Sequence, residues 1–63
     1  MDYHRIYDTL IVNAQCRKIS KAGYYEQHHI IPKCQGGSDN KDNLVFLTAR
    51  EHYIAHLCLV KMF

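Results

Sequence analysis

A chain of 63 residues has little interior in which to bury apolar side chains, and this limits the folds open to it. A domain of this size removes only about 60% of its unfolded surface from water. Below roughly 70 to 80 residues, a hydrophobic core alone rarely contributes more than about 3 to 5 kcal/mol of stability. The sequence therefore predicts a single small domain that a bound metal, a partner or further chain would help to keep folded.

The composition is that of an ordinary globular domain, with 48% hydrophobic and 22% charged residues. The longest apolar runs, such as residues 57–60, are far shorter than the about 20 residues that span a bilayer. Residues 1–5 lack the apolar stretch of a signal peptide. We therefore expect a cytoplasmic protein with no membrane partner.

The three cysteines are odd in number and widely spaced, so they do not form the disulfide framework of a small secreted protein. We expect free thiols at Cys16, Cys34 and Cys58. Cys58 lies in an apolar run and is expected to behave as a small core residue. Cys34, which follows a pair of histidines, is the one cysteine that we keep as a candidate accessory metal ligand.

The net charge of +2 is too small to indicate a nucleic-acid binder by itself. Its distribution is more informative, because positions 17 to 33 contain one acid, Glu26, and four basic residues: Arg17, Lys18, Lys21 and Lys33. Such a cluster can contact phosphates, although it is more often solvated surface. We therefore treat these four residues as candidate phosphate contacts only if a nucleic-acid-binding motif accompanies them.

Two segments carry the apolar periodicity of amphipathic helices. Residues 2–19 contain no glycine or proline, and their apolar side chains recur every three or four positions: Tyr3, Ile6, Tyr7, Leu10, Ile11 and Ala14. Thr48 followed by Glu51 matches a capping box, so a second helix is expected over residues 48–63. Its expected buried stripe consists of Tyr53, Ala55, Leu57 and Val60. No glycine or proline ends this helix, so the chain could be a fragment of a longer protein.

The central segment, residues 24–47, predicts a β-hairpin with a long polar connection. Residues 24–31 are rich in aromatic and β-branched side chains up to Pro32, which cannot donate a ladder hydrogen bond, and they are expected to form one strand. Residues 36–43 are turn-forming, and the apolar residues 44–47 are expected to form the second strand. The chain should therefore be an α+β protein, a small ββα unit with an N-terminal helix packed on it.

Four of the five histidines fall on the predicted ββα unit. His52 and His56 are four residues apart on a helix, so they share a face with Cβ atoms about 5 to 6 Å apart and can reach one ion. His28 and His29 lie on the first strand of the hairpin, which a following helix is expected to cover. A single histidine is more often a surface or core residue than a ligand, but four within residues 28–56 favour a metal site.

In these motifs the chain resembles the HNH, or His-Me finger (ββα-metal), nucleases, and in particular the phage-type HNH homing endonucleases. The resemblance covers most of the chain. It rests on EQHHIIPK at residues 26–33, GGS at 36–38, DNLV at 42–45, TAREH at 48–52, and His56 with the apolar helix after it. It implies a metal-dependent endonuclease that hydrolyses phosphodiester bonds in DNA, which we expect to be double-stranded. It also implies a location in the cytoplasm of a bacterial or phage-infected host cell.

The resemblance implies a role for each histidine of the motif. His28, His52 and His56 would bind one divalent cation, with Mg²⁺, Mn²⁺, Ni²⁺ or Zn²⁺ as the candidates. His29 would be the general base that takes a proton from the attacking water, since an imidazole with an unperturbed pKa of about 6.5 can be neutral at cellular pH. Asn43 would order the hairpin loop and so place the base.

Two further residues are candidates because of their positions. Glu26 is two residues from His28 on the same side of the strand, where it could accept the second ring N–H of that ligand, so we count it with the catalytic residues. Arg50 precedes His52 and could contact a DNA phosphate. A solvated carboxylate and a surface arginine are the alternative interpretations. Adjacent strand residues point to opposite faces, so His28 and His29 cannot both face the helix unless the strand twists or ends there.

Two alternatives to the enzyme remain open. One is a non-catalytic structural zinc module that binds nucleic acid or protein, with Cys34 as a fourth ligand. The other is an inactive or partial nuclease fragment, whose surface around Ile6, Leu10 and Val60 normally packs on missing chain. A closed shell of four protein ligands would favour the zinc module, whereas three protein ligands with an open position would favour the enzyme.

Overall fold

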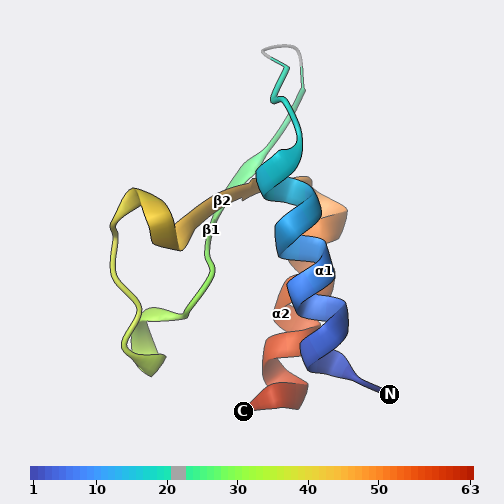
Figure 1. The fold of residues 1–63 in the computed structure, drawn as a ribbon, viewed down its shortest axis with the longest axis vertical. Helices are drawn as coiled ribbons and strands as arrows, with labels where there is room; N and C mark the ends of the chain where they lie inside the picture. The colour runs from blue at the N-terminus through green and yellow to red at the C-terminus, as the bar shows by residue number, and fades with distance from the viewer. Residues whose placement is uncertain (21–22) are drawn as a thin grey trace.

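The computed structural model describes residues 1–20 and 23–63, which form two helices, a two-stranded sheet and two short 3₁₀ turns. In chain order the elements are α1 (Tyr3–Cys16), β1 (Glu26–His29), η1 (Lys33–Gln35), η2 (Lys41–Asn43), β2 (Leu44–Leu47) and α2 (Ala49–Met62). The helices run antiparallel side by side, so both termini lie at the same end, and the hairpin packs against them (Figure 1). This arrangement confirms the expected α+β class, a ββα unit with an N-terminal helix packed on it.

Helix α1 forms because its apolar side chains recur on one face and because Asp2 caps its first turn. The Asp2 carboxylate accepts a hydrogen bond from the Arg5 backbone N–H at 3.1 Å. The buried side chains are three or four positions apart: Tyr7, Ile11 and Ala14. The helix ends at Cys16, three residues earlier than the sequence predicts, because Arg17 adopts extended backbone with φ −82° and ψ 144°.

Strands β1 and β2 pair antiparallel, with Glu26 opposite Leu47 and His29 opposite Leu44. Because side chains alternate along a strand, His28 shares one face with the buried residues Val45 and Leu47, whereas His29 lies on the other face. Strand β1 ends at His29, earlier than position 31, where the expected strand would end. The sequence predicted that His28 and His29 could not both face the helix unless the strand twisted or ended there. The strand does end at His29.

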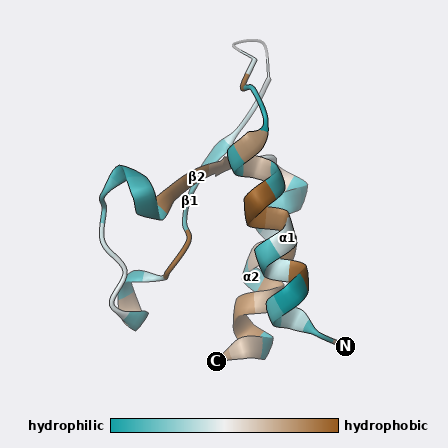
Figure 2. Ribbon diagram, in the orientation of Figure 1, coloured by the Kyte–Doolittle hydropathy of each residue, from teal (hydrophilic) through white to brown (hydrophobic). Residues whose placement is uncertain are grey.

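The connection between the strands, residues 30–43, is largely hydrophilic (Figure 2). It contains the turns η1 and η2, and Gly36 ends η1 with a left-handed φ of 90° that favours glycine. Gly37 lies so close to the chain before it that an added Cβ would collide with the carbonyl oxygen of Ile31. The two glycines thus allow the connection to fold back on itself beneath the end of β1.

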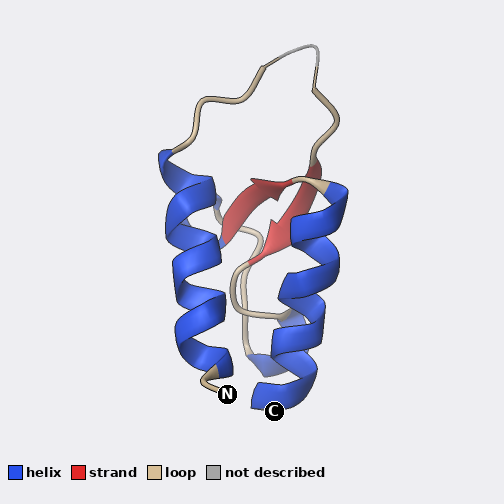
Figure 3. Ribbon diagram, turned by 90° about the vertical axis from the view of Figure 1, so that its right-hand side faces the viewer, coloured by secondary structure: helices blue, strands red, loops and turns tan. Residues whose placement is uncertain are grey.

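Helix α2 begins as the sequence predicts, with Thr48 as its N-cap. The Thr48 hydroxyl accepts from the Glu51 N–H at 3.2 Å, and the Glu51 carboxylate accepts from the Thr48 N–H at 2.9 Å. The expected buried stripe is wrong at three of its four positions, because Tyr53, Leu57 and Val60 are exposed. The helix instead packs against α1 and the hairpin (Figure 3) through a neighbouring face. That face carries Ala55, Cys58 and Leu59, which are buried.

The core lies between the two helices and the inner face of the hairpin. It consists of Tyr7, Ile11, Ala14, Val45, Leu47, Ala55, Cys58 and Leu59. Cys58 is only 2% exposed, which confirms its expected place in the core. Within residues 1–20 and 23–63, no helix is long and apolar enough to cross a membrane.

Candidate metal centre

Three imidazoles converge where β1 packs against α2. His28 comes from the inner face of β1, and His52 and His56 come from successive turns of α2. Each ring offers one nitrogen, and these three nitrogens lie within 4.8 Å of one another. In the described part of the chain, they are the one group of three potential ligands placed closely enough to share an ion.

The geometry of the two helix histidines fits a shared ion. Their Nε2 atoms are 3.0 Å apart. Two nitrogen ligands in a tetrahedral zinc site, with bonds of about 2.0 to 2.1 Å, are separated by about 3.3 Å. A small side-chain adjustment would therefore place both nitrogens at bonding distance from one cation.

A carboxylate orients His52. The Nδ1 atom of His52 donates to Glu26 Oε1 at 2.8 Å, and the Tyr24 hydroxyl donates to the other carboxylate oxygen at 2.8 Å. These hydrogen bonds, that from His52 first, lower the pKa of Glu26. Since the ring proton is on Nδ1, the lone pair of Nε2 is left for an ion. From the sequence, Glu26 was expected to accept a hydrogen bond from the second ring nitrogen of His28. Its partner is instead His52. The Nε2 atom of His28 is hydrogen-bonded to Tyr7.

His28 is held by a residue of α1 that the sequence analysis did not identify. Its Nε2 atom is 2.8 Å from the hydroxyl of Tyr7, and both side chains belong to buried residues. Burial is the main reason that the pKa of His28 falls to about 4, with smaller effects from His52 and His56. The ring is therefore neutral at cellular pH, as a metal ligand must be. Burial also raises the pKa of Tyr7 to about 12, so the phenol keeps its proton.

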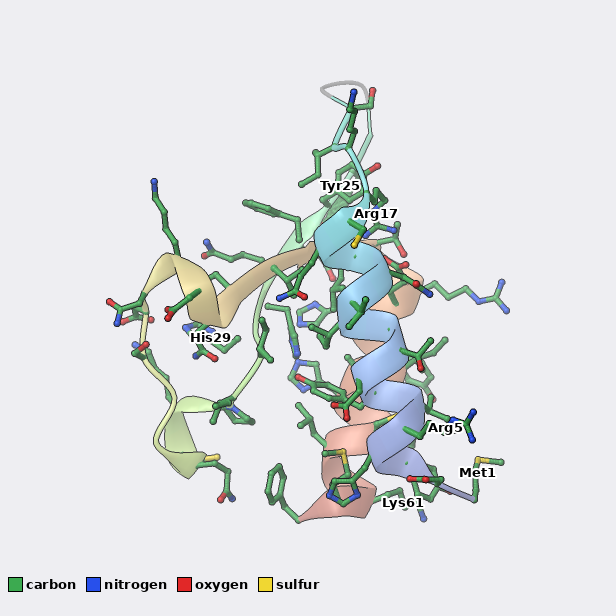
Figure 4. The ribbon with its side chains drawn as sticks, viewed as in Figure 1. Met1, Arg5, Arg17, Tyr25, His29 and Lys61 are labelled. Atoms are coloured by element: carbon green, nitrogen blue, oxygen red, sulfur yellow. The ribbon has the colours of Figure 1, made fainter. Side chains whose placement is uncertain are left out.

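His29 lies on the opposite side of the hairpin from the helices (Figure 4). Its Nε2 atom donates to Asp39 Oδ1 at 2.7 Å, and Lys33 Nζ is 2.9 Å from Asp39 Oδ2. The hydrogen bonds from His29 and Lys33 lower the pKa of Asp39. Asp39 was not among the residues predicted from the sequence, and its one local signal is a position in the turn-forming segment 36–43.

An open pocket of about 290 Å³ is lined by residues from both faces of strand β1 and from α2. All four histidines of the motif line it, together with Gln27, Pro32, Lys33 and Leu59. His29 lines this pocket from the end of β1, although it faces away from His28 in the strand alternation. The three-histidine group and the separate His29 can therefore both reach one molecule bound there.

Asn43 ties together the two ends of the connection that carries Asp39. Its carboxamide oxygen accepts from the Ile31 N–H at 2.8 Å, and its nitrogen donates to the carbonyl oxygens of Ile31 at 3.1 Å and Ser38 at 2.7 Å. The side chain is thus in a position to order the loop next to His29.

The five candidate phosphate contacts have different surroundings. The Arg17 guanidinium donates to both carboxylate oxygens of Glu51, at 2.8 and 2.7 Å, and to the Phe46 carbonyl at 3.0 Å, and it stacks near Tyr25 (Figure 4). Because its terminal nitrogens are used within the fold, we do not retain it as a phosphate contact. The exposed candidates are Lys18, Lys33 and Arg50, while Lys21 lies outside the described residues.

Cys34, the candidate fourth ligand, does not belong to the three-histidine group. It is an exposed free thiol, as is Cys16. Among the described residues, the centre therefore offers three protein ligands, the number expected for an open site, and nothing in it favours the closed structural zinc module.

Comparison with known proteins supports the resemblance seen in the motifs. The model of the HNH endonuclease family matches residues 15–56. Probable mobile endonuclease E of Enterobacteria phage T4 is 57% identical over 63 residues, which cover 100% of this chain and 44% of that protein. Probable mobile endonucleases D and C of the same phage are each 52% identical, over 98% and 100% of this chain and 25% and 31% of their own lengths.

The chain spans less than half the length of these curated relatives. No solved structure matches the chain. The family model nonetheless covers most of the residues, including the three histidines of the centre, His29 and Asn43. On this match and on its similarity to the phage proteins along its whole length, the chain belongs to the HNH endonuclease family.

Proposed function

We propose that this chain is the nuclease domain of a phage-type endonuclease that cleaves phosphodiester bonds in double-stranded DNA with one divalent cation and a histidine base. The observation that best supports this proposal is the pocket lined by four histidines. Three of them offer converging ring nitrogens, and the fourth, His29, has a carboxylate partner of its own. The similarity to phage proteins named as mobile endonucleases supports action in the cytoplasm of an infected bacterial host.

His28, His52 and His56 would hold the cation. Three nitrogen ligands leave positions open for oxygen atoms of a substrate and of water. When bound, a divalent cation acts as a Lewis acid that stabilises the negative charge developing on the phosphate. Since imidazole nitrogen suits Zn²⁺ and Ni²⁺ better than Mg²⁺ or Mn²⁺, this donor set favours Zn²⁺ and Ni²⁺.

His29 would act as the general base. Because its Nε2 proton is donated to Asp39, the lone pair of the neutral ring is on Nδ1, which can take a proton from the attacking water. Asp39 would keep the ring in this orientation and stabilise the imidazolium that forms after proton transfer. Lys33, which lines the pocket, keeps the Asp39 carboxylate in place from its other side.

Other residues would position the loop and the DNA. Asn43 would hold the connection so that Asp39 stays beside His29. The exposed cations Lys18, Lys33 and Arg50 would contact DNA phosphates, which fix the orientation of a protein on a duplex but do not read its sequence. Binding should therefore weaken as the salt concentration rises.

Cleavage of supercoiled plasmid tests the proposal. The chain is incubated with plasmid in Zn²⁺, Ni²⁺, Mn²⁺ or Mg²⁺, and conversion to nicked or linear DNA is measured on gels. His29→Ala should lower the rate by about 10² to 10⁴, the usual contribution of a general base. His4→Ala is the matched control, because His4 is an exposed histidine that does not line the pocket.

The outcomes separate the enzyme from the alternatives. Metal-dependent cleavage by the wild-type chain and by His4→Ala, but not by His29→Ala, supports the proposal. Cleavage no faster than that of His29→Ala in all four metals contradicts it. Faster cleavage of single-stranded DNA or of RNA than of plasmid would contradict the assignment of double-stranded DNA alone.

A further inference from the structure

We infer that Tyr7 is a positioning residue for the metal centre: its hydroxyl fixes the ring proton of His28 on Nε2, so that His28 presents Nδ1 to the ion. This inference rests on the metal centre of the proposed function. Tyr7 lies on α1, outside residues 15–56 that the family model matches, and 21 positions before its partner. It would thus make the N-terminal helix part of the centre.

Two hydrogen bonds of the Tyr7 hydroxyl determine which nitrogen of His28 carries the ring proton. The Tyr7 hydroxyl lies 2.6 Å from the carbonyl oxygen of Ile30 and 2.8 Å from Nε2 of His28. A carbonyl oxygen can only accept, and a phenol has a single proton, so that proton goes to Ile30. The second contact is a hydrogen bond only if His28 Nε2 carries a proton and donates it to the phenol oxygen.

This arrangement determines which nitrogen of His28 can bind an ion. In a neutral imidazole one nitrogen has the proton and the other has the lone pair, so Nδ1 is left as the ligand atom. The ring is also held sterically, because Tyr7 and His28 are 4% and 3% exposed and their rings meet edge to face, with centroids 6.0 Å apart. Neither ring has room to turn freely, so the tautomer and the orientation are fixed together.

The centre would then use both histidine tautomers. His52 donates its Nδ1 proton to Glu26 and offers Nε2, whereas His28 donates its Nε2 proton to Tyr7 and offers Nδ1. The two partners come from different elements, since Glu26 lies on β1 and Tyr7 lies on α1. A group that accepts the second ring N–H of a ligand histidine typically contributes about 10- to 100-fold to metal affinity.

Nitrogen NMR and metal titration test the inference without DNA. In ¹⁵N-labelled chain, long-range ¹H–¹⁵N spectra at neutral pH should show His28 protonated on Nε2 without metal, and bound through Nδ1 in Zn²⁺. Calorimetric titration with Zn²⁺ should show that Tyr7→Phe, which lacks only the hydroxyl oxygen, binds about 10- to 100-fold more weakly. Tyr3→Phe is the matched control, because Tyr3 is on the same helix and packs against the core.

The inference is supported if His28 binds through Nδ1 and only Tyr7→Phe loses affinity. It is overturned if zinc binds Nε2 of His28, or if Tyr7→Phe binds zinc as tightly as Tyr3→Phe does. Should Tyr7→Phe fail to fold, the wild-type spectra decide the question by themselves. A wild-type chain that gives the expected spectra but never cuts plasmid would contradict the proposed function and leave the role of Tyr7 intact.

Discussion

Replacing Asn43 with alanine should both destabilise the chain and impair its base. The side chain makes three hydrogen bonds, to the N–H and C=O of Ile31 and to the C=O of Ser38. Asn43→Ala removes all three and leaves the backbone hydrogen bond from the Ile30 N–H to the Asn43 carbonyl, so the connection loses its side-chain ties to Ile31 and Ser38. Asp39, which follows Ser38 directly, would then lose its fixed distance from His29.

The size of the effect follows from those three bonds. Each hydrogen bond contributes about 0.5 to 1.5 kcal/mol net to stability, so losing all three should lower the free energy of unfolding by about 1.5 to 4.5 kcal/mol. The backbone partners are only partly buried and can bond to water instead, which favours the lower half, about 1.5 to 3 kcal/mol. A core of this size supplies only about 3 to 5 kcal/mol, so the variant should be marginally stable without metal.

Urea unfolding in EDTA, followed by circular dichroism, measures this loss. Asn40→Ala is the control, since Asn40 is exposed on the same loop and its side chain caps nothing. Asn43→Asp keeps the acceptor for the Ile31 N–H but turns a carboxylate oxygen toward two carbonyls, so it should be at least as harmful as alanine. The reasoning would be refuted if Asn43→Ala stayed within about 0.5 kcal/mol of Asn40→Ala, the usual range for surface substitutions.

Three further predictions concern stability. Arg17→Met should lower the free energy of unfolding by about 1 to 2 kcal/mol, because it removes the charged hydrogen bonds to Glu51. This loss should be smaller in 1 M salt than at low salt. Urea curves that match those of the wild type at both salt concentrations would contradict the prediction. Gly37→Ala should cost about 1 to 3 kcal/mol by forcing the Ile31 carbonyl aside. Ser38→Ala removes the hydrogen bond from the Asn40 N–H to the Ser38 hydroxyl and should cost less. Equal melting temperatures for the two variants would argue against the close approach at Gly37. Free Zn²⁺ at about 100 times its Kd should stabilise the chain by about 2.7 kcal/mol relative to EDTA, and an unchanged melting curve would mean that no folded-state site exists.

Local sequence signals predicted the elements better than their packing. The capping box of Thr48 and Glu51 placed the start of α2 within one residue, because its atoms are close in sequence. The buried face of α2 was predicted wrongly, since Tyr53 and Val60 are each 72% exposed. Helical periodicity allows more than one face, and the choice depends on where α1 and the hairpin lie, which short-range patterns do not encode.

The centre shows the same division. His52 and His56 are four residues apart on one helix, so their proximity could be predicted from the sequence. The hairpin that packs on this helix was expected to bring His28 to them, and the three side chains do form one group. The partners of these ligands come from elsewhere in the chain. Tyr7 is 21 positions from His28, and Asp39 is 10 positions from His29 in a loop with no periodic pattern. A tyrosine in the apolar stripe of a helix is expected to be a core residue, and Tyr7 is one. Nothing in its local sequence indicates that it also holds His28.

In the proposed centre three histidines bind one cation, while a fourth histidine stays outside its ligand shell. A crystal structure of the chain soaked with Zn²⁺ tests this directly. We predict one ion bound by His28, His52 and His56 with at least one non-protein ligand, and His29 still hydrogen-bonded to Asp39. An ion that takes His29 or Cys34 as a ligand, or a His28 ring that does not touch the ion, would contradict the account.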